Sequence, residues 1–261
     1  MKALFNLVDE VRLAKPLVVQ YTNRVTINDC ANVTLAVGAS PIMSASVEEV
    51  DDMVSSASSV VINIGDMESS DLFIKAAKTA NKYQIPIVLD PVAAFASKKR
   101  RELIEILLKE VNFTVIKGNI SEMKFLAGFE FNGRGVDCFD EDDPTEVAIT
   151  LAKRYNCIAA ATGKIDAISD GKKTYKILNG DENLQSITGT GCMCTSLVGS
   201  FLGATDNALE ASTMGILSMS LSGELAGANK PNIGTFRVKL MDNLNSLSVD
   251  KLKSFAKIEL V

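Results

Sequence analysis

A glycine-rich turn, Thr188-Gly189-Thr190-Gly191-Cys192, has the residue types that can bind an anion. A strongly apolar run follows it at residues 193–202. Glycine permits positive φ and a close approach of the backbone to a ligand. The first N–H groups of a helix have no partner within the helix, and they carry the positive end of its dipole. The turn therefore predicts a helix N-terminus that binds phosphate. A tight loop in front of a buried cysteine is the alternative.

Polar and glycine residues also follow five runs of Val- and Ile-rich sequence. These runs are apolar on both faces, which is typical of parallel strands covered by helices on both sides. Strands are therefore expected at residues 17–22, 59–64, 86–92, 113–117 and 158–162. Ligands of open α/β sheets bind beyond the carboxyl ends of the strands. A binding site is expected where these five ends meet.

Two carboxylates stand at those strand ends. Asp90 follows a buried strand, and Pro91 fixes the backbone after it. The alternative for Asp90 is a turn residue that binds the amides of its own loop. Glu122 lies in Asn119-x-x-Glu122, which also fits a capping box at the start of a helix. Together Asp90 and Glu122 could hold a hydrated Mg²⁺, which takes few protein carboxylates.

Composition excludes several chemistries. The chain has 261 residues and no histidine, which excludes Ser-His-Asp catalysis, histidine bases and histidine-bound zinc. A net charge of −5 argues against a nucleic-acid surface, and the basic cluster at residues 98–101 is expected to start a solvated helix. There is no P-loop, and the dinucleotide fingerprint fails because Cys194 stands where a third glycine would be needed.

The alternation of strands with helices predicts right-handed βαβ units in a single α/β domain, residues 1–261. Helices are expected at residues 71–83, 99–110, 147–155, 207–228 and 250–258. Asp143-Pro144-Thr145-Glu146 is typical of a helix start, with Asp as N-cap. Residues 172–178 are expected to form a hairpin arm with the segment after them, and residues 129–143 a surface loop.

The five cysteines lack CxxC spacing, and the apolar neighbours of Cys30, Cys157 and Cys194 indicate small core residues in a reducing cytoplasm. The N-terminus has no signal peptide, because Asp9, Glu10 and Arg12 interrupt any apolar segment. No apolar run reaches the length of a membrane span. A cytoplasmic protein without membrane contact is expected.

An ordered series of short motifs resembles the hydroxyethylthiazole kinase family of the ribokinase-like superfamily. In chain order the motifs are Thr22-Asn23-x-Val25, Cys30-Ala31-Asn32, the block at residues 35–43, Asn63-Ile64-Gly65, Asp90-Pro91-Val92, Lys117-Gly118-Asn119-x-x-Glu122, Thr162-Gly163-x-x-Asp166, Thr188-Gly189-Thr190-Gly191-Cys192, Glu224-Leu225-Ala226 and Gly234-Thr235-Phe236. The cysteine at position 192 distinguishes this family from most ribokinase-like kinases, which resemble one another in having aspartate there.

The resemblance implies a three-layer fold with a central, mostly parallel sheet flanked by helices. It implies transfer of the γ-phosphate of ATP to 4-methyl-5-(2-hydroxyethyl)thiazole in thiamine salvage. By matching position, it places Met43 and Gly189 against the thiazole, Lys117 and Thr162 against ATP, Asp90 and Glu122 at Mg²⁺, and Cys192 beside the reacting hydroxyl. It also implies a homotrimer with active sites at the subunit interfaces.

Two roles for Cys192 stay open at this point. A thiol near a helix N-terminus has a lowered pKa, so Cys192 could accept the hydroxyl proton as a thiolate. Alternatively it shapes the pocket without proton transfer. Phosphoryl transfer is largely dissociative, so a strong base is helpful but not essential.

Some positions depart from the family pattern. Val19 replaces histidine, Asp66 replaces threonine, Phe95 lies in a segment that is usually glycine-rich, and Asn232-Ile233-Gly234 replaces Gly-Pro-Gly. Three alternatives stay open: a related kinase of a pyrimidine or pyridoxal alcohol, a catalytically weak thiazole-binding protein, which Val19 and Phe95 favour, and a dehydratase of the same fold acting on a damaged nicotinamide cofactor.

Overall fold

The sheet at the centre of the molecule is mostly parallel. The computed structural model describes residues 2–129 and 143–261, and within them nine strands follow the order β2-β1-β3-β4-β5-β6-β7-β8-β9. The strands are β1 (Leu17–Tyr21), β2 (Ser40–Met43), β3 (Ser59–Asn63), β4 (Ile87–Asp90), β5 (Val115–Asn119), β6 (Ile158–Thr162), β7 (Asp166–Ser169), β8 (Thr174–Ile177) and β9 (Ile258–Leu260). Neighbours from β2 to β6 run parallel, and neighbours from β6 to β9 run antiparallel.

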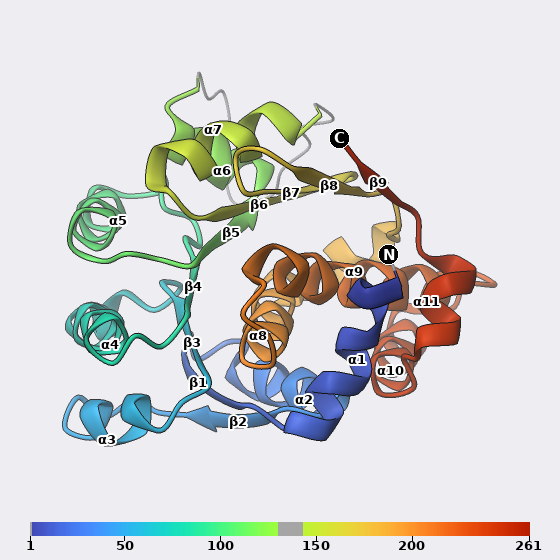
Figure 1. Cartoon of the computed structure of the whole chain (residues 1–261), viewed down its shortest axis with the longest axis horizontal. Coiled ribbons are helices and arrows are strands. Elements are labelled where there is room, and N and C mark those ends of the chain that lie inside the picture. Colours follow the sequence, from blue (N-terminus) through green and yellow to red (C-terminus); the bar gives the residue numbers. More distant parts are fainter. Residues whose placement is uncertain (1, 130–142) are drawn as a thin grey trace.

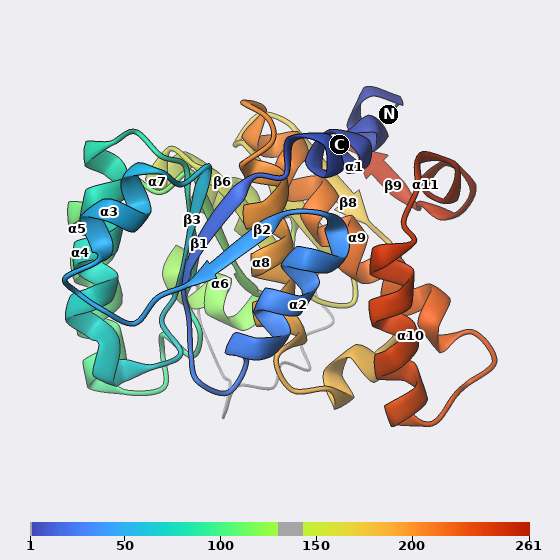
Figure 2. The same ribbon diagram turned by 90° about the horizontal axis from the view of Figure 1, so that it is seen from below.

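Helices cover both faces of the sheet, which confirms the predicted fold class. On the convex face lie α3 (Val50–Ser55), α4 (Ser70–Lys82), α5 (Lys98–Glu110), α6 (Ile120–Ala127) and α7 (Thr145–Tyr155). Inside the curve lie α1 (Lys2–Ala14), α2 (Ile27–Val37), α8 (Thr190–Leu202), α9 (Ala208–Gly227), α10 (Ile233–Asn245) and α11 (Val249–Phe255), as Figures 1 and 2 show. Two short 3₁₀ helices, Met67–Ser69 and Glu182–Ser186, complete the described elements.

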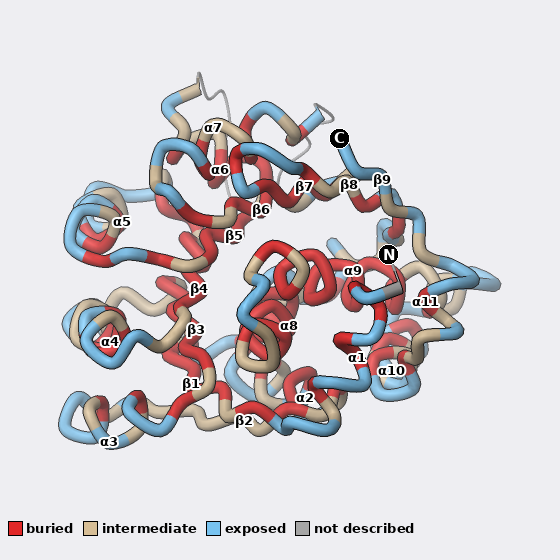
Figure 3. The backbone as a smooth tube through the Cα atoms, viewed as in Figure 1, coloured by how far each residue is buried: buried red, intermediate tan, exposed pale blue. Residues whose placement is uncertain are grey.

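The two faces of the sheet bury separate cores, because successive strand residues point to opposite sides. Val60 and Ile62 of β3 face the core beneath α4 and α5, whereas Val61 faces the core around α8 and α9. Figure 3 shows both buried layers on either side of the strands. Burial on both faces explains why these strands lack alternation in the sequence.

Helix α8 is held close to the sheet by a glycine. A Cβ on Gly199 would lie 2.6 Å from Val61 Cγ2, so a larger residue would push the helix away. Ser59 Oγ donates a hydrogen bond to the Gly199 carbonyl at 2.7 Å. These contacts fix where the N-terminus of α8 reaches the edge of the sheet.

The expected strands and most expected helices are confirmed within a few residues. The helix expected at 250–258 is wrong at its end, since α11 stops at Phe255 and the chain then forms β9. The arm at 172–178 pairs with β7, which precedes it, as well as with β9. Asp143 Oδ1 accepts the N–H of Thr145, and α7 begins at Thr145. Residues 130–142 of the expected surface loop lie outside the described residues.

Several elements were not predicted from the sequence, among them β2, α1, α2, α3 and α10. The edge strand β2 is short, contains Pro41 and is half-buried, so it carries little strand signal. Helix α1 forms at Lys2–Ala14, a segment for which the sequence predicts no structural element. Among the described residues, no helix is both long enough and apolar enough to cross a membrane.

Candidate functional site

The carboxyl ends of β1, β3 and β4 are joined by a chain of buried side-chain hydrogen bonds. Asn23 Nδ2 donates to Asn63 Oδ1 at 3.1 Å, and Asn63 Nδ2 donates to Asp90 Oδ2 at 3.0 Å. The parallel register places Asn63 directly opposite Asp90. All three side chains are buried. Asp90 therefore lies within a polar network at the strand ends, as its place in the sequence predicted.

The N-terminus of α8 lies against this network. Gly189 has φ +87°, and a Cβ there would lie 2.4 Å from Thr26 Cγ2, so the turn requires glycine. Thr195 Oγ1, one turn into the helix, donates to Asp90 Oδ2 at 2.6 Å. Asn23 Nδ2 lies 3.5 Å from Cys192 Sγ. The predicted glycine turn and the predicted carboxylate are thus neighbours.

The first turn of α8 offers backbone donors to a ligand. The helical hydrogen bonds begin with Met193 N–H donating to Gly189 O at 2.8 Å. The N–H groups of Thr190, Gly191 and Cys192 precede that bond, and the N-cap residue Gly189 has no side chain to cap them. Together with the helix dipole, these N–H groups make the site suitable for an anion.

Lys117 on β5 brings a positive charge beneath the same turn. Its Nζ donates to the Gly191 carbonyl at 2.9 Å, and the side chain is 2% exposed. Burial acts to lower its pKa, but the nearby charge of Asp90, followed by Cys194 and Glu122, outweighs burial and raises the pKa. Lys117 therefore stays charged at neutral pH next to the donors of α8.

The capping box predicted at the start of α6 is present. Asn119 Oδ1 accepts Glu122 N–H at 2.9 Å, and Glu122 Oε2 accepts Asn119 N–H at 2.8 Å. The other oxygen, Oε1, accepts Ala93 N–H from the loop after β4 at 2.8 Å. Burial, and next the charge of Asp90, raises the pKa of Glu122 to about 7. The carboxylate is held rigidly, near enough to Asp90 to feel its charge.

Thr162 and Met43 stand at the same edge of the sheet, on either side of this centre. Thr162 Oγ1 at the end of β6 donates to Gly118 O at 3.2 Å. Met43 ends the half-buried edge strand β2, where it pairs with Gln20 of β1. The sheet order places Met43 two strands from Asn63. Their predicted contacts with ATP and with the thiazole stay predictions.

The expectation that Cys192 has a lowered pKa is wrong. Burial, and next the charge of Asp90, raises the pKa of this thiol to about 11. Position in the first turn of α8 favours the thiolate, but loss of solvent and a neighbouring carboxylate outweigh it. Cys192 is therefore a neutral thiol at physiological pH. Its sulfur accepts a hydrogen bond from Asn23, which fixes its orientation.

Replacing Cys192 with alanine is accordingly expected to lower kcat by less than about 10-fold. A general base typically contributes ~10²–10⁴-fold, and a protonated thiol does not supply that. The measurement is kcat, for the phosphoryl transfer that the resemblance implies, of the wild type and of Cys192→Ala between about pH 6 and pH 9. A larger loss would contradict the neutral-thiol assignment. So would a rise of kcat with pH that is present in the wild type and absent from the variant.

The sequence did not indicate the part that Arg100, like Thr195, plays in organising the site. Arg100 belongs to the basic cluster expected to be solvated, yet its guanidinium is half-buried. It donates to the carbonyl oxygens of Ile64 and Gly65 after β3 and of Val92 after β4. Arg100 thus clamps two site loops together. The cluster itself gave no signal that one member would turn inward.

Three departures from the family pattern have structural roles. Val19 is fully buried in the core beneath α4. Asp66 Oδ1 accepts Glu68 N–H, and its other oxygen pairs with Arg24 Nε at 3.1 Å. Phe95 packs edge-on against Phe125, with the ring centroids 6.2 Å apart. None of these contacts involves Asp90, Lys117 or the first turn of α8.

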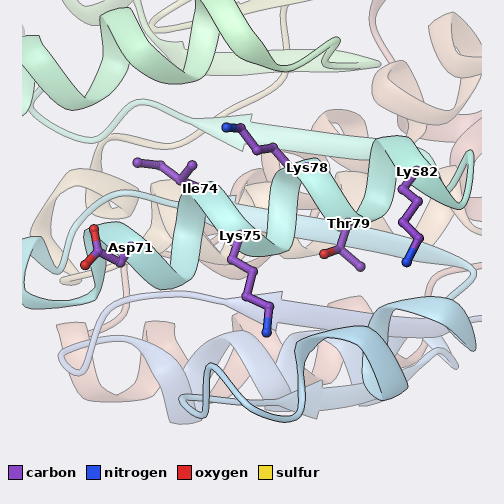
Figure 4. Close-up of a pocket in the computed structure, with 6 residues that line it drawn as sticks. All are labelled: Asp71, Ile74, Lys75, Lys78, Thr79 and Lys82. Atoms are coloured by element: carbon purple, nitrogen blue, oxygen red, sulfur yellow. The ribbon is translucent and has the colours of Figure 1, made fainter.

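Two surface hollows lie away from the strand ends. A groove of about 470 Å³ runs along α4 (Figure 4). The lysines that line it already form hydrogen bonds or ion pairs within the protein. Lys75 Nζ donates to Val47 O, Lys78 pairs with Glu110, and Lys82 pairs with Asp51. A hollow of about 700 Å³ lies at the opposite end of the sheet, beside Pro86 and Gly203. Neither includes a residue of the network around Asp90.

The pKa of Glu122 predicts how stability changes with pH. The chain has no histidine, so none of its side chains has an unperturbed pKa near 6.5. A carboxyl group with a folded-state pKa of about 7 instead of 4.5 holds its proton longer in the folded than in the unfolded state. Stability from this group is present below the unfolded pKa and is lost as pH rises through the folded pKa.

The thermal midpoint, measured in the presence of a metal chelator, should therefore decrease as the pH is raised from about 5 to about 7.5. In Glu122→Gln the dependence should be flatter, while the midpoint is lower throughout because one backbone N–H loses its acceptor. A midpoint that rises over this interval, or an equal slope in the variant, would contradict the assignment.

The fold is that of ribokinase-like proteins, and the site gathers groups that bind phosphate. A mostly parallel sheet carries a carboxylate, a lysine and a helix N-terminus at one edge. Pyridoxal kinase from Staphylococcus aureus has the same fold, with a TM-score of 0.63, 13% identity and coverage of 95% of this chain and 98% of that one.

The particular family is shown by closer matches. The model of the hydroxyethylthiazole kinase family matches residues 8–250, so the chain belongs to this family. It is 58% identical to a hydroxyethylthiazole kinase of Clostridioides difficile over 98% of this chain and 99% of that protein. It also matches the structure of the hydroxyethylthiazole kinase protein from Pyrococcus horikoshii, with a TM-score of 0.92, 36% identity and full coverage of both chains.

Proposed function

We propose that this protein transfers the γ-phosphate of ATP to the hydroxyl of 4-methyl-5-(2-hydroxyethyl)thiazole, a step of thiamine salvage. The observation that carries the proposal is the meeting of the α8 N-terminus with Lys117 and Asp90. Donors placed where phosphoryl charge develops are the main requirement of such a transfer. The names of the relatives indicate the alcohol.

Each predicted site residue has a role that fits its position. The N–H groups after Gly189 would bind the transferring phosphoryl group, and Lys117 would balance its charge from below. Thr162 would contact the nucleotide from the end of β6, the strand beside Lys117. Met43 and Gly189 would line the thiazole site, on the β1–β2 side of the sheet.

The donor set fits Mg²⁺, which takes one or two carboxylates and keeps several waters. Among the described residues, Asn63 and Thr195 each donate a side-chain hydrogen bond to Asp90, and both bonds end on Oδ2. Both oxygens of Glu122 accept backbone N–H groups, so Glu122 is suited to hold a magnesium-bound water. No group of three or more acidic or cysteine ligands occurs in the described part of the chain. When bound, Mg²⁺ would neutralise charge on the phosphates.

The proton of the substrate hydroxyl does not need Cys192 as a base. In a largely dissociative transfer the bond from phosphorus to ADP is mostly broken before the alcohol oxygen bonds. The hydroxyl proton is then lost late, when the oxygen has become acidic. The neutral Cys192 thiol would hold the alcohol in place beside the first turn of α8.

A cytoplasmic homotrimer with active sites at subunit interfaces also belongs to this proposal. Apolar side chains are exposed just before α2, on α2 and on α10. Val25 is 75%, Leu35 57% and Val238 61% exposed. The half-buried strand β2 brings Met43 to the same part of the surface. The four described cysteines are free thiols, which fits a reducing compartment.

The function is tested by incubating the protein with Mg-ATP and a panel of alcohols while ADP release is measured. ADP release that depends on the thiazole alcohol supports the proposal. ADP release only with a pyrimidine or pyridoxal alcohol would assign the protein to a related kinase. Tight binding of the thiazole without ADP release would make it a binding protein, and either result contradicts the proposal.

A further inference from the structure

A buried carboxylate next to the nucleotide side of the site has no part in the roles above. Asp166 begins β7, directly after the turn that leaves β6, and its side chain is 4% exposed. Its Oδ1 accepts Gly163 N–H at 3.0 Å, and its Oδ2 accepts Ser220 Oγ–H at 2.8 Å. Each oxygen therefore holds a different part of the chain.

The first of these bonds fixes the turn beside Thr162. Gly163 is the residue after Thr162, so its bond to Asp166 sets the direction in which the backbone leaves β6. A Cβ on Gly163 would meet only Ile165 O, at an ordinary 3.6 Å. Packing inside the protein does not require glycine there. The bare backbone of Gly163 leaves room for a bound molecule against the turn.

The second bond connects this turn to α9, which packs against α8, the helix whose N-terminus forms the anion site. Ser220 lies on α9, and α9 packs along α8. Burial, the largest influence, raises the pKa of Asp166 to about 6, so it is mostly ionised at neutral pH. Hydrogen bonds to an ionised acceptor are shorter and stronger than neutral ones. Asp166 thus joins the turn after β6 to the α8–α9 pair.

We propose that Asp166 is a positioning residue for the nucleotide: it holds residues 163–165 at a set place relative to the N-terminus of α8. The inference rests on the proposed function, since it assumes that ATP binds along this turn and presents its γ-phosphate to α8. Asp166 itself touches neither the nucleotide nor the alcohol. Its removal should weaken nucleotide binding and leave the phosphoryl transfer step almost unchanged.

The experiment measures ADP binding calorimetrically in the presence of Mg²⁺, together with kcat and both KM values. Asp166→Ala should bind ADP about 10-fold more weakly, as expected for the loss of a hydrogen bond to a charged group. Its KM for ATP should rise to match, while kcat and KM for the thiazole alcohol change less than about 2-fold. Asp166→Asn should restore ADP binding to within about 2-fold, because its carbonyl oxygen can still accept Gly163 N–H.

Ser169→Ala is the matched control. Ser169 is fully buried at the other end of β7, and its Oγ accepts Gly171 N–H at 3.0 Å, so it also closes a turn. This variant should lower the thermal midpoint without changing ADP affinity. If Asp166→Ala does not fold, Ser220→Ala breaks only the tie to α9, and about 3-fold weaker ADP binding is expected.

Unchanged ADP affinity in a folded Asp166→Ala overturns the inference, as does an equal loss in Ser169→Ala. So does an Asp166→Asn variant as weak as Asp166→Ala, because charge and not position would then be responsible. A wild-type protein that binds no ADP would overturn the proposed function itself and the inference with it.

Discussion

Gly191→Val should lower kcat/KM by about 10³-fold, while the protein still folds. A Cβ at this position would meet only Lys117 Nζ, at 3.7 Å, so the valine side chain would occupy the space in front of the α8 donors. Loss of one donor to a developing negative charge lowers the rate by ~10²–10³-fold, and valine would screen more than one. The measurement is steady-state kinetics with the thiazole alcohol and Mg-ATP, with circular dichroism to verify folding.

Gly234→Val is the matched control for this change. Gly234 is the second residue of α10, as Gly191 is of α8, and nothing lies within 4 Å of a Cβ built there. The control should alter kcat/KM by less than about 2-fold. A folded Gly191→Val with wild-type activity would show that phosphate does not bind at α8.

Asp90→Asn should also lower kcat by about 10³-fold, through charge and not shape. The side-chain oxygen of asparagine can still accept the bonds from Asn63 and Thr195 that now reach Oδ2. The amide lacks the negative charge that a hard cation requires, and it no longer balances Lys117. A titration of activity with Mg²⁺ should show a large rise in the magnesium concentration that gives half-maximal rate.

Asp206→Asn serves as the control for Asp90→Asn, since Asp206 is exposed beside the hollow at the opposite end of the sheet. It should leave both kcat and the magnesium requirement unchanged. An Asp90→Asn enzyme with wild-type kcat at ordinary magnesium concentrations would remove Asp90 from the proposed cation site.

The strands were predictable because their sequence signal is local. The run that forms β3 is apolar on both faces, and a polar residue, Asn63, marks its end. The capping box of α6 was likewise contained in four consecutive residues. Parallel strands place their carboxyl ends at one edge, so the fold class predicted that Asp90 and Lys117 would lie close together.

The features that were missed depend on contacts between distant parts of the chain. Nothing near Arg100 in the sequence indicates the carbonyl groups that it binds after β3 and β4. The pKa of Cys192 depends on burial and on Asp90, which are properties of the folded state. Strand β9 forms because Ile258–Leu260 finds β8 as a partner, and three residues carry too little signal by themselves.

The most direct measurement is a crystal structure of the protein with Mg²⁺, a non-hydrolysable ATP analogue and the thiazole alcohol. The terminal phosphoryl oxygens should lie within hydrogen-bond distance of backbone N–H groups of Thr190, Gly191 or Cys192, with Lys117 and Asp90 alongside. A terminal phosphate bound elsewhere, with those three N–H groups facing solvent or protein, would contradict the central claim.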